Sequence, residues 1–211
     1  GANGTLAGPL TIGVIPTIAP YILPDLLSML AEAYPDLEPR FVEEQTQHLI
    51  TRLRNGNLDL AIMALPSEAT GMVDSPLYTE KFSIVCPPDH PIAGREDVEL
   101  AELKDLDLLL LDDGHCLRDQ VVDLCRHADI NPAEATNSVT RASSLTTIMQ
   151  LVMGGLGCTL VPESALATEC HGKDVAIAHF ASDVTAEREV GLVFRSSAAR
   201  AEEFREFGTL I

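Results

Sequence analysis

The sequence predicts an α/β fold of two Rossmann-like lobes joined by two crossover segments. Short apolar runs that suit strands alternate with amphipathic runs that suit helices, and this alternation is typical of a parallel sheet covered by helices on both faces. The alternation begins near Leu10 and begins again near Leu106, after a proline-rich stretch at Pro87 to Pro91. With 211 residues, of which 46% are apolar, the chain is long enough for two lobes of about 100 residues each.

The first lobe begins with a βαβαβ pattern. Its apolar runs are nearly continuous, as expected of strands buried on both faces, and Gly56 suits the end of the second helix. The return of the chain near its C-terminus adds one more strand and helix to this lobe. The expected elements are a strand at Leu10 to Ile15, a helix at Pro20 to Tyr34, a strand at Pro39 to Glu43, a helix at Thr46 to Asn55, a strand at Leu58 to Leu65, and later a strand at Glu189 to Phe194 and a helix at Ala198 to Phe207.

The second lobe follows an extended run that carries the chain across from the first. We expect lobe I to comprise residues 9–77 and 187–211, and lobe II to comprise residues 78–186. Gly154 and Gly155 are expected to end one of its helices. The expected elements are an extended run at Tyr78 to Cys86, a strand at Leu106 to Leu111, a helix from about Cys116, a strand at Ser138 to Thr140, a helix at Ser144 to Met153, a strand at Cys158 to Val161 and an extended run at Val175 to Phe180.

Charge and cysteine content narrow the possible functions. The 14 lysines and arginines face 32 carboxylates, a formal charge of −18, so this segment cannot by itself bind phosphate backbones non-specifically. The sequence shows neither a run of 18 apolar residues nor a signal peptide, so we expect no membrane span. Five cysteines form an odd set in a domain large enough to need no disulfides, which favours a reducing cytoplasm and a redox-active or metal-binding role for any dithiol pair.

The run Asp112-Asp113-Gly114-His115-Cys116-Leu117-Arg118-Asp119-Gln120 carries the strongest chemical signal. It places a thiol beside an imidazole where a predicted strand gives way to a helix. A helix N-terminus or an adjacent cation stabilises the nucleophilic thiolate, and His115 and Arg118 are the candidate cations. The nearby aspartates oppose a thiolate, and the sequence leaves open whether they orient His115 or pair with Arg118.

Cys125 follows Cys116 by nine residues. If both lie on one helix, about 13 to 14 Å of axial rise and about half a turn of net rotation separate them, so they face opposite ways. A disulfide requires Cα atoms about 4.4 to 6.8 Å apart, so this pair can bond only if the helix unwinds. The plainer interpretation is one solvent-side thiol and one buried cysteine that packs as a small apolar residue.

Other polar residues stand at the expected strand ends, where open α/β sheets bind ligands. Thr17 follows the first strand, Thr46 opens the second helix, and Ser143 and Ser144 precede a later helix. Together with His115 they are candidates for lining a cleft that holds a small polar ligand. Residue types alone favour a simpler role, because serine and threonine are preferred as helix N-caps.

The run Gly114 to Gln120 with Cys125 resembles the redox loop of the OxyR-like, hydrogen-peroxide-sensing LysR-type transcription regulators. Supporting stretches are Ile15 to Pro24 and Glu44 to Thr46, and the likeness extends over nearly the whole chain. It implies a LysR effector domain with a periplasmic-binding-protein type II-like fold. The winged helix-turn-helix of that family is absent from this segment.

The resemblance also implies residue roles and partners. Cys116 is the peroxide-reacting cysteine, Cys125 resolves its sulfenate to a disulfide, and Thr17, Thr46, His115 and Arg188 bind peroxide. Arg188 is preferred to Arg195 for the arginine expected from the late strand. The protein is then a stoichiometric sensor that needs no cofactor or metal. Its partners are hydrogen peroxide, further copies (a dimer of this domain, a tetramer at full length), promoter DNA through the missing domain, RNA polymerase and a cellular dithiol reductant.

Three alternatives remain open from the residues. His115, Cys116, Cys125 and His127 could supply four zinc ligands, but structural zinc usually takes ligands paired at two to four residues. A thiol peroxidase shares the first chemical steps, yet Leu109 and Asp113 replace the proline and the threonine or serine that a peroxiredoxin carries before its cysteine. A metabolite-binding LysR-type effector domain is the third, and only the Cys116 and Cys125 pair argues against it.

Overall fold

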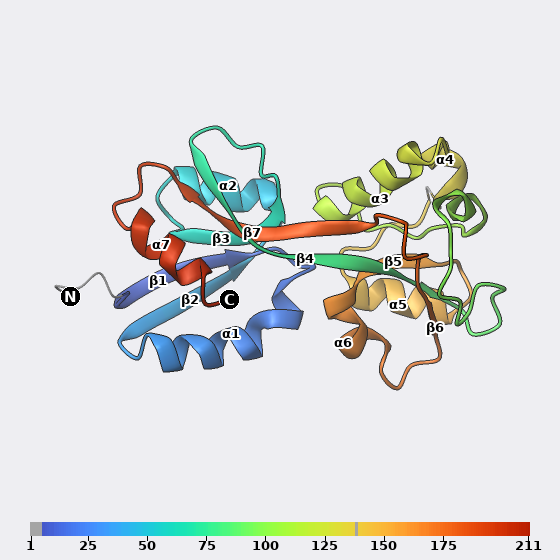
Figure 1. Ribbon diagram of the computed structural model, residues 1–211, viewed down its shortest axis with the longest axis horizontal. Helices are drawn as coiled ribbons and strands as arrows, with labels where there is room; N and C mark the ends of the chain where they lie inside the picture. The colour runs from blue at the N-terminus through green and yellow to red at the C-terminus, as the bar shows by residue number, and fades with distance from the viewer. Residues whose placement is uncertain (1–5, 138) are drawn as a thin grey trace. The chain divides into compact units, whose positions relative to one another are not determined.

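The computed structural model describes residues 6–137 and 139–211. The chain divides into two compact units, one made of the chain up to Thr79 together with Glu189–Ile211, the other of Glu80–Arg188. Strands β4 (Met72–Cys86) and β7 (Glu187–Arg195) both include a unit boundary, so the chain passes between the units twice (Figure 1). Within the described residues, no helix is long and apolar enough to cross a membrane.

Unit 1 is built on a parallel sheet that confirms the predicted βαβαβ pattern. Strand β1 pairs in parallel with β2 from Gly8↔Leu37 to Val14↔Glu43, and on its other side with β3. The returning strand β7 pairs antiparallel with β3. The other elements of unit 1 are β1 (Gly8–Val14), α1 (Ala19–Ala33), β2 (Leu37–Glu43), α2 (Thr46–Arg54), β3 (Leu60–Leu65) and α7 (Ala201–Gly208).

Helices α1 and α2 lie on opposite sides of this sheet (Figure 1), as right-handed crossovers in opposite directions require. Gly13 in β1 has no room for a side chain, because a Cβ there would lie 2.6 Å from Leu49 and 2.7 Å from Leu58. Helix α7 adds aromatic packing, with Phe207 stacked on Tyr34 at 6.2 Å between ring centroids. The close packing at Gly13 lies one residue before the end of β1, which the candidate residue Thr17 follows.

Unit 2 has shorter and less regular elements. Strand β4 pairs antiparallel with β5, from Phe82↔Pro162 to Val85↔Thr159, and with β6. Strand β4 begins at Met72, six residues earlier than the extended run expected from Tyr78. The elements of unit 2 besides β4 are the 3-10 helix η1 (Leu100–Asp105), α3 (Cys116–His127), α4 (Pro132–Ala135), α5 (Leu145–Met153), β5 (Thr159–Pro162), the 3-10 helix η2 (Glu163–Ala165), α6 (Leu166–Cys170) and β6 (Ala176–Ala178).

Two predicted strands of this unit do not form as expected. The buried run Leu106 to Leu111 makes only isolated parallel bridges, two at Leu108 and one at Leu111. Asp107 within it has a positive φ of 49°, which breaks the extended backbone. The strand expected at Ser138 to Thr140 is wrong for its last two residues, which lie outside any strand, while Ser138 lies outside the described residues. The bridges instead use Thr136 and Ala142, on either side of that segment.

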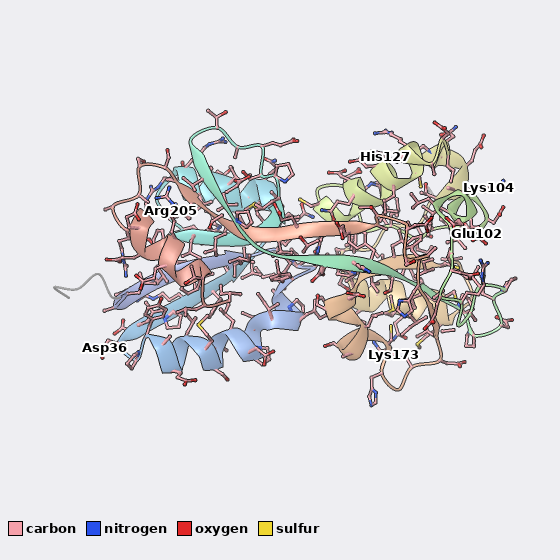
Figure 2. The ribbon with its side chains drawn as sticks, viewed as in Figure 1. Asp36, Glu102, Lys104, His127, Lys173 and Arg205 are labelled. Atoms are coloured by element: carbon pink, nitrogen blue, oxygen red, sulfur yellow. The ribbon has the colours of Figure 1, made fainter. Side chains whose placement is uncertain are left out.

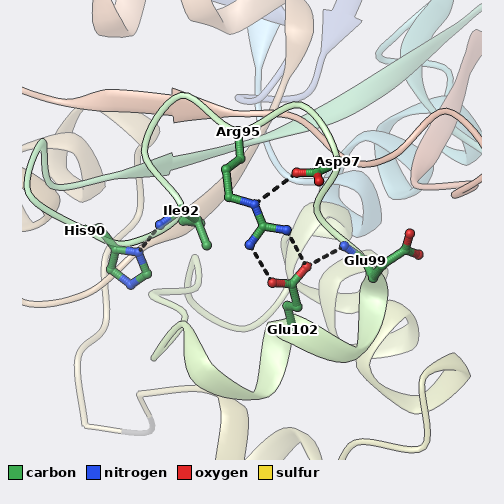
Figure 3. Close-up of polar contacts among 6 residues, drawn as sticks. All are labelled: His90, Ile92, Arg95, Asp97, Glu99 and Glu102. Carbon is green, nitrogen blue, oxygen red and sulfur yellow. Dashed lines mark hydrogen bonds and ion pairs between the residues drawn. The ribbon is translucent and has the colours of Figure 1, made fainter.

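A charged network anchors η1, which packs against α3. Arg95 bonds both carboxylate oxygens of Glu102, at 2.6 and 3.1 Å, and Asp97 at 2.9 Å (Figure 3). Glu102 also accepts a hydrogen bond from the Glu99 amide as part of a capping box. Charge-assisted hydrogen bonds therefore hold η1 in place beside α3.

Candidate redox site

The loop before α3 places Cys116 at a helix start, as the sequence predicted. Gly114 has a φ of +95°, a conformation that glycine adopts without steric cost. His115 is the N-cap residue with extended backbone angles, and Cys116 is the first residue of the helix. The free amides of a helix N-terminus favour a negative charge, so this position suits a thiolate.

Two arginines neutralise the aspartates around the loop. Arg118 Nε lies 3.1 Å from Asp113, and its Nη1 donates to the Leu111 carbonyl at 3.0 Å. Arg141 lies 3.1 Å from Asp112 and 3.6 Å from Asp113. A hydrogen bond from the Asp113 amide, aided by Arg141, lowers the pKa of Asp112. Of the alternatives left open above, the structure therefore favours pairing of Asp113 with Arg118.

His115 is not the cation that the sequence suggested, because its imidazole is buried. Its side chain is buried at 4% exposure, and burial lowers its pKa despite the opposing influence of Asp112. The imidazole is therefore neutral at pH 7. Its Nε2 atom is buried and has no hydrogen-bond partner among the described residues. Buried polar atoms are nearly always bonded, so His115 stays a candidate for binding a small polar ligand.

Cys125 lies on the same helix as Cys116 and is fully buried, whereas Cys116 is partly exposed. Burial raises the pKa of Cys125, so its thiol is protonated at neutral pH. Nine residues of helix separate the two by about 13.5 Å of rise and place them on opposite faces. Neither cysteine is in a disulfide bond, so the structure describes the dithiol state, and a bond between them requires α3 to break.

The candidate threonines belong to unit 1. Thr17 and Thr46 are both buried, each three residues beyond the paired ends of β1 and β2, Val14↔Glu43. Neither is an N-cap residue, because α1 is capped by Ile18 and α2 by Gln45. Ser144 does cap its helix, α5, and accepts a hydrogen bond from the Thr147 amide at 3.2 Å. The capping interpretation is thus right for the serine and wrong for the threonines.

Arg188 is a buried arginine of unit 2 with a carboxylate partner that sequence reasoning missed. Its Nη2 lies 3.1 Å from Glu80 on β4, and the two side chains are 0% and 8% exposed. The same Glu80 oxygen accepts a hydrogen bond from Ser164 at 3.1 Å. Arg188 and Glu80 stand 108 residues apart, and no local pattern signals their pairing. The alternative arginine, Arg195, has a buried Nε without a hydrogen-bond partner among the described residues.

The remaining cysteines are buried and unreactive. Burial, with smaller effects of Cys86 and Asp107, raises the pKa of Cys158 to about 12. Burial likewise raises the pKa values of Cys86 and Cys170. Among all residues that the structure describes, no group of three or more histidines, cysteines and carboxylates is placed to hold a metal ion. His127 occupies the last residue of α3 (Figure 2), where its Nδ1 lies 2.8 Å from the Asp123 carbonyl.

Comparison with known proteins defines the class of this fold. Residues 3–211 match the model of the LysR substrate binding domain. The chain belongs to this family. The predicted fold class is thereby confirmed as the periplasmic-binding-protein type II-like domain of LysR regulators.

Several similar proteins carry names that refer to hydrogen peroxide or to OxyR. The chain is 45% identical over 211 residues to a probable hydrogen peroxide-inducible genes activator of Mycobacterium leprae, covering 100% of this chain and 67% of that protein. It is 37% identical to the DNA-binding transcriptional dual regulator OxyR of Escherichia coli K12, covering 98% and 66%. It also resembles a solved structure of a Corynebacterium glutamicum OxyR cysteine-to-serine mutant with hydrogen peroxide bound, with 63% identity, a TM-score of 0.96, and coverage of 99% and 65%. The chain thus spans about two thirds of the length of these relatives.

Proposed function

We propose that this chain is the regulatory domain of an OxyR-type, hydrogen-peroxide-responsive transcription regulator. The observation that carries the proposal is the pair of cysteines on α3 outside any disulfide bond, one partly exposed at the helix start and one buried nine residues later. The relatives' names and the peroxide-bound and oxidised forms of C. glutamicum OxyR support it. A regulator needs one oxidation event for each signal, so the domain acts as a stoichiometric sensor and not as an enzyme.

The first step is attack of the Cys116 thiolate on one peroxide oxygen. The sulfur–oxygen bond forms as the oxygen–oxygen bond breaks, the cysteine is oxidised to a sulfenic acid, and the departing hydroxide takes up a proton to become water. Thr17, Thr46, His115 and Arg188 bind the peroxide in this proposal. Hydrogen-bond donors and a cation stabilise the negative charge that develops on the leaving oxygen.

The second step joins Cys125 to the oxidised Cys116. The Cys125 sulfur attacks the sulfenic sulfur, a disulfide forms, and the hydroxyl group leaves with the Cys125 proton as water. Because the two cysteines face opposite sides of α3, the helix unwinds before this bond closes. Unwinding alters the surface that α3 presents and thereby the contacts between copies, and promoter DNA and RNA polymerase respond in the complete protein. A dithiol reductant returns the domain to its starting state.

The test is mass spectrometry of the reduced domain after brief exposure to one or two equivalents of hydrogen peroxide. We expect the wild type to lose two hydrogen atoms and to yield a Cys116–Cys125 crosslinked peptide. The Cys125→Ser variant should gain one oxygen at Cys116, and the Cys116→Ser variant should remain unchanged. Slow oxidation scattered over all five cysteines would contradict the proposal and leave a metabolite-binding effector domain as the better account of the family match.

A further inference from the structure

A second pair of cysteines lies face to face in the sheet of unit 2. Strand β4 pairs antiparallel with β5 in a register that runs to Val85↔Thr159 (Figure 1). One residue further along the same register, Cys86, the last residue of β4, stands opposite Cys158, the residue directly before β5. Directly opposed residues of an antiparallel pair point to the same face, so the two thiols are neighbours on one face of the sheet.

Two further observations support this placement. Cys86 also pairs with Ala176 of β6, and Cys158 makes a parallel bridge with Leu108, so the backbone of each cysteine is held by a second neighbour. Burial raises the pKa of Cys158 most, and the nearness of Cys86 raises it further. The two sulfur atoms are therefore close enough for their charges to interact.

The geometry of an antiparallel pair suits a disulfide bond. Opposed residues have Cα atoms about 4.5–5.5 Å apart, and a disulfide requires about 4.4–6.8 Å. This pair meets the requirement within the folded sheet, whereas α3 must break to join Cys116 and Cys125. Closing the bond removes the hydrogen bond from Cys86 Sγ to the Ala176 carbonyl, at 3.7 Å, and a thiol is a weak donor.

Burial makes this pair slow to react and, once oxidised, slow to be reduced. Cys86 and Cys158 are 0% and 1% exposed, and burial raises the pKa values of both thiols. Because the thiolate is the reacting species, each of them reacts with peroxide far more slowly than Cys116. A disulfide in the same place is shielded from reductants, whose thiolates must reach one of its sulfur atoms. The pair therefore suits a slow and lasting modification.

We propose that Cys86 and Cys158 form a second disulfide in the folded domain during sustained exposure to hydrogen peroxide. One sulfur attacks a peroxide oxygen, the oxygen–oxygen bond breaks, and a sulfenic acid and one water form. The other sulfur then attacks the sulfenic sulfur, and the hydroxyl group leaves with the thiol proton as a second water. Two thiols and one hydrogen peroxide thus give one disulfide and two waters.

The position of this disulfide in the chain gives it a role. The bond closes a loop that contains Cys116, Cys125 and the whole of α3. It therefore joins the two ends of the segment that rearranges, and it holds the sheet of unit 2 together while α3 is open. This consequence rests on the proposed function, whereas the formation of the disulfide does not.

The test uses the whole chain with Cys116→Ser and Cys125→Ser, which removes the fast-reacting pair. The reduced protein is incubated for hours with excess hydrogen peroxide under native conditions and mapped by mass spectrometry. We expect the loss of two hydrogen atoms and a Cys86–Cys158 crosslinked peptide. The Tm should rise by about 5–15 °C, because the bond closes a loop of about 70 residues.

The cysteine that remains supplies two controls. Cys170 is buried in the same unit, and Cys170→Ala in the double variant should leave the crosslink and the Tm rise unchanged. Cys158→Ala should abolish both. In denaturing urea, oxidation of the double variant should favour a Cys158–Cys170 bond, because the shorter loop closes at a lower entropic cost.

The outcomes separate this inference from the proposed function, since the double variant lacks both cysteines of the proposed redox switch. A Cys86–Cys158 crosslink in the native protein with a raised Tm supports the inference. Thiols that stay reduced, sulfinic acids at separate cysteines, or a Cys158–Cys170 bond in the native protein would overturn it. A crosslink that lowers the Tm would also overturn it, because the folded sheet would then not accommodate the bond.

Discussion

Strand pairing is more regular in unit 1 than in unit 2. In unit 1, β1 pairs with β2 over seven consecutive residues, and the strand-to-helix connections carry buried threonines within a continuous core. In unit 2, the run Leu106 to Leu111 makes only isolated bridges, and the loop and helix that follow contain two buried polar atoms, His115 Nε2 and Gln120 Oε1, without hydrogen-bond partners among the described residues. Regions with fewer cooperative backbone bonds open at lower free energy. The rearrangement that the proposed disulfide requires is therefore placed where we expect opening to cost less free energy.

Helices α2 and α3 both begin where an extended segment ends, but they differ in how many of their residues are buried. Helix α2 buries four of its nine residues, whereas α3 buries three of twelve. The buried residues of α3 include Cys125, which would leave its buried position in the proposed disulfide. The predictions below use this contrast, from the largest expected effect to the smallest.

Replacing the partly exposed thiol of unit 2 should have the largest effect. Cys116→Ser removes the nucleophile, and we expect the rate constant for hydrogen peroxide to fall by more than about 1,000-fold, because an alcohol has no thiolate form at neutral pH. Stopped-flow measurement under peroxide excess gives the rate. Cys158→Ser is the matched control, since its buried thiol is held protonated, and a comparable loss in that variant would refute the assignment of roles.

Shortening a core side chain in unit 1 should lower the stability of the fold without changing the reactivity of Cys116. Leu53 is fully buried in α2, and Leu53→Ala should lower the free energy of unfolding by about 2–5 kcal/mol. The peroxide rate of Cys116 should change less than twofold. Leu117→Ala, beneath the redox loop in unit 2, should lower stability by a similar amount and slow the reaction as well. Urea unfolding and stopped-flow kinetics measure the two quantities, and equal rate losses in both variants would remove the distinction between the units.

The sequence predicted unit 1 better than unit 2 for a physical reason. Elements such as β1 and α2 have periodic apolar patterns that match their burial, so local reading and tertiary packing agree. The run Leu106 to Leu111 is as apolar as a strand, but its neighbours supply single bridges and Asp107 adopts a positive φ. Apolar composition predicts that a segment is buried and cannot predict how many partners pair with it.

The candidate site was likewise only partly predictable from the sequence. The placement of Cys116 at the start of α3 and Cys125 on its far side follows from spacing and from local helix signals, and both could be predicted. The pairing of Glu80 with Arg188 joins residues 108 positions apart and depends on tertiary structure alone. The unsatisfied oxygen of Gln120 is also invisible in sequence, because the burial of one atom depends on its packing.

The pairing of Arg118 with Asp113 should slow the second oxidation step. Arg118→Gln removes this ion pair and the bond to the Leu111 carbonyl, which together hold the start of α3. We expect disulfide formation from the sulfenic acid to accelerate about threefold, consistent with the small worth of a partly exposed pair. The first step should change less. Arg126→Gln, at an exposed arginine of the same helix, serves as control, and acceleration in both variants would indicate a general effect of charge.

The smallest effect concerns pH. Burial lowers the folded-state pKa of His115 below its unfolded value of about 6.5, so the unfolded chain takes up a proton first as pH falls. The stability that neutral His115 provides is present above pH 6.5 and decreases as pH falls below it. Urea unfolding of wild type and His115→Gln at pH 7.5 and 5.5 measures it. A wild type that loses no more stability than the variant would show that His115 is not the group responsible.

Hydrogen–deuterium exchange with mass spectrometry, before and after one equivalent of hydrogen peroxide, tests the central claim most directly. The claim is that α3 breaks to join Cys116 and Cys125 while unit 1 keeps its structure. It predicts that amides of α3 lose protection as the Cys116–Cys125 disulfide appears in the same sample, while those of α2 remain protected. A disulfide formed with α3 still protected, or equal loss of protection in α2 and α3, would contradict it.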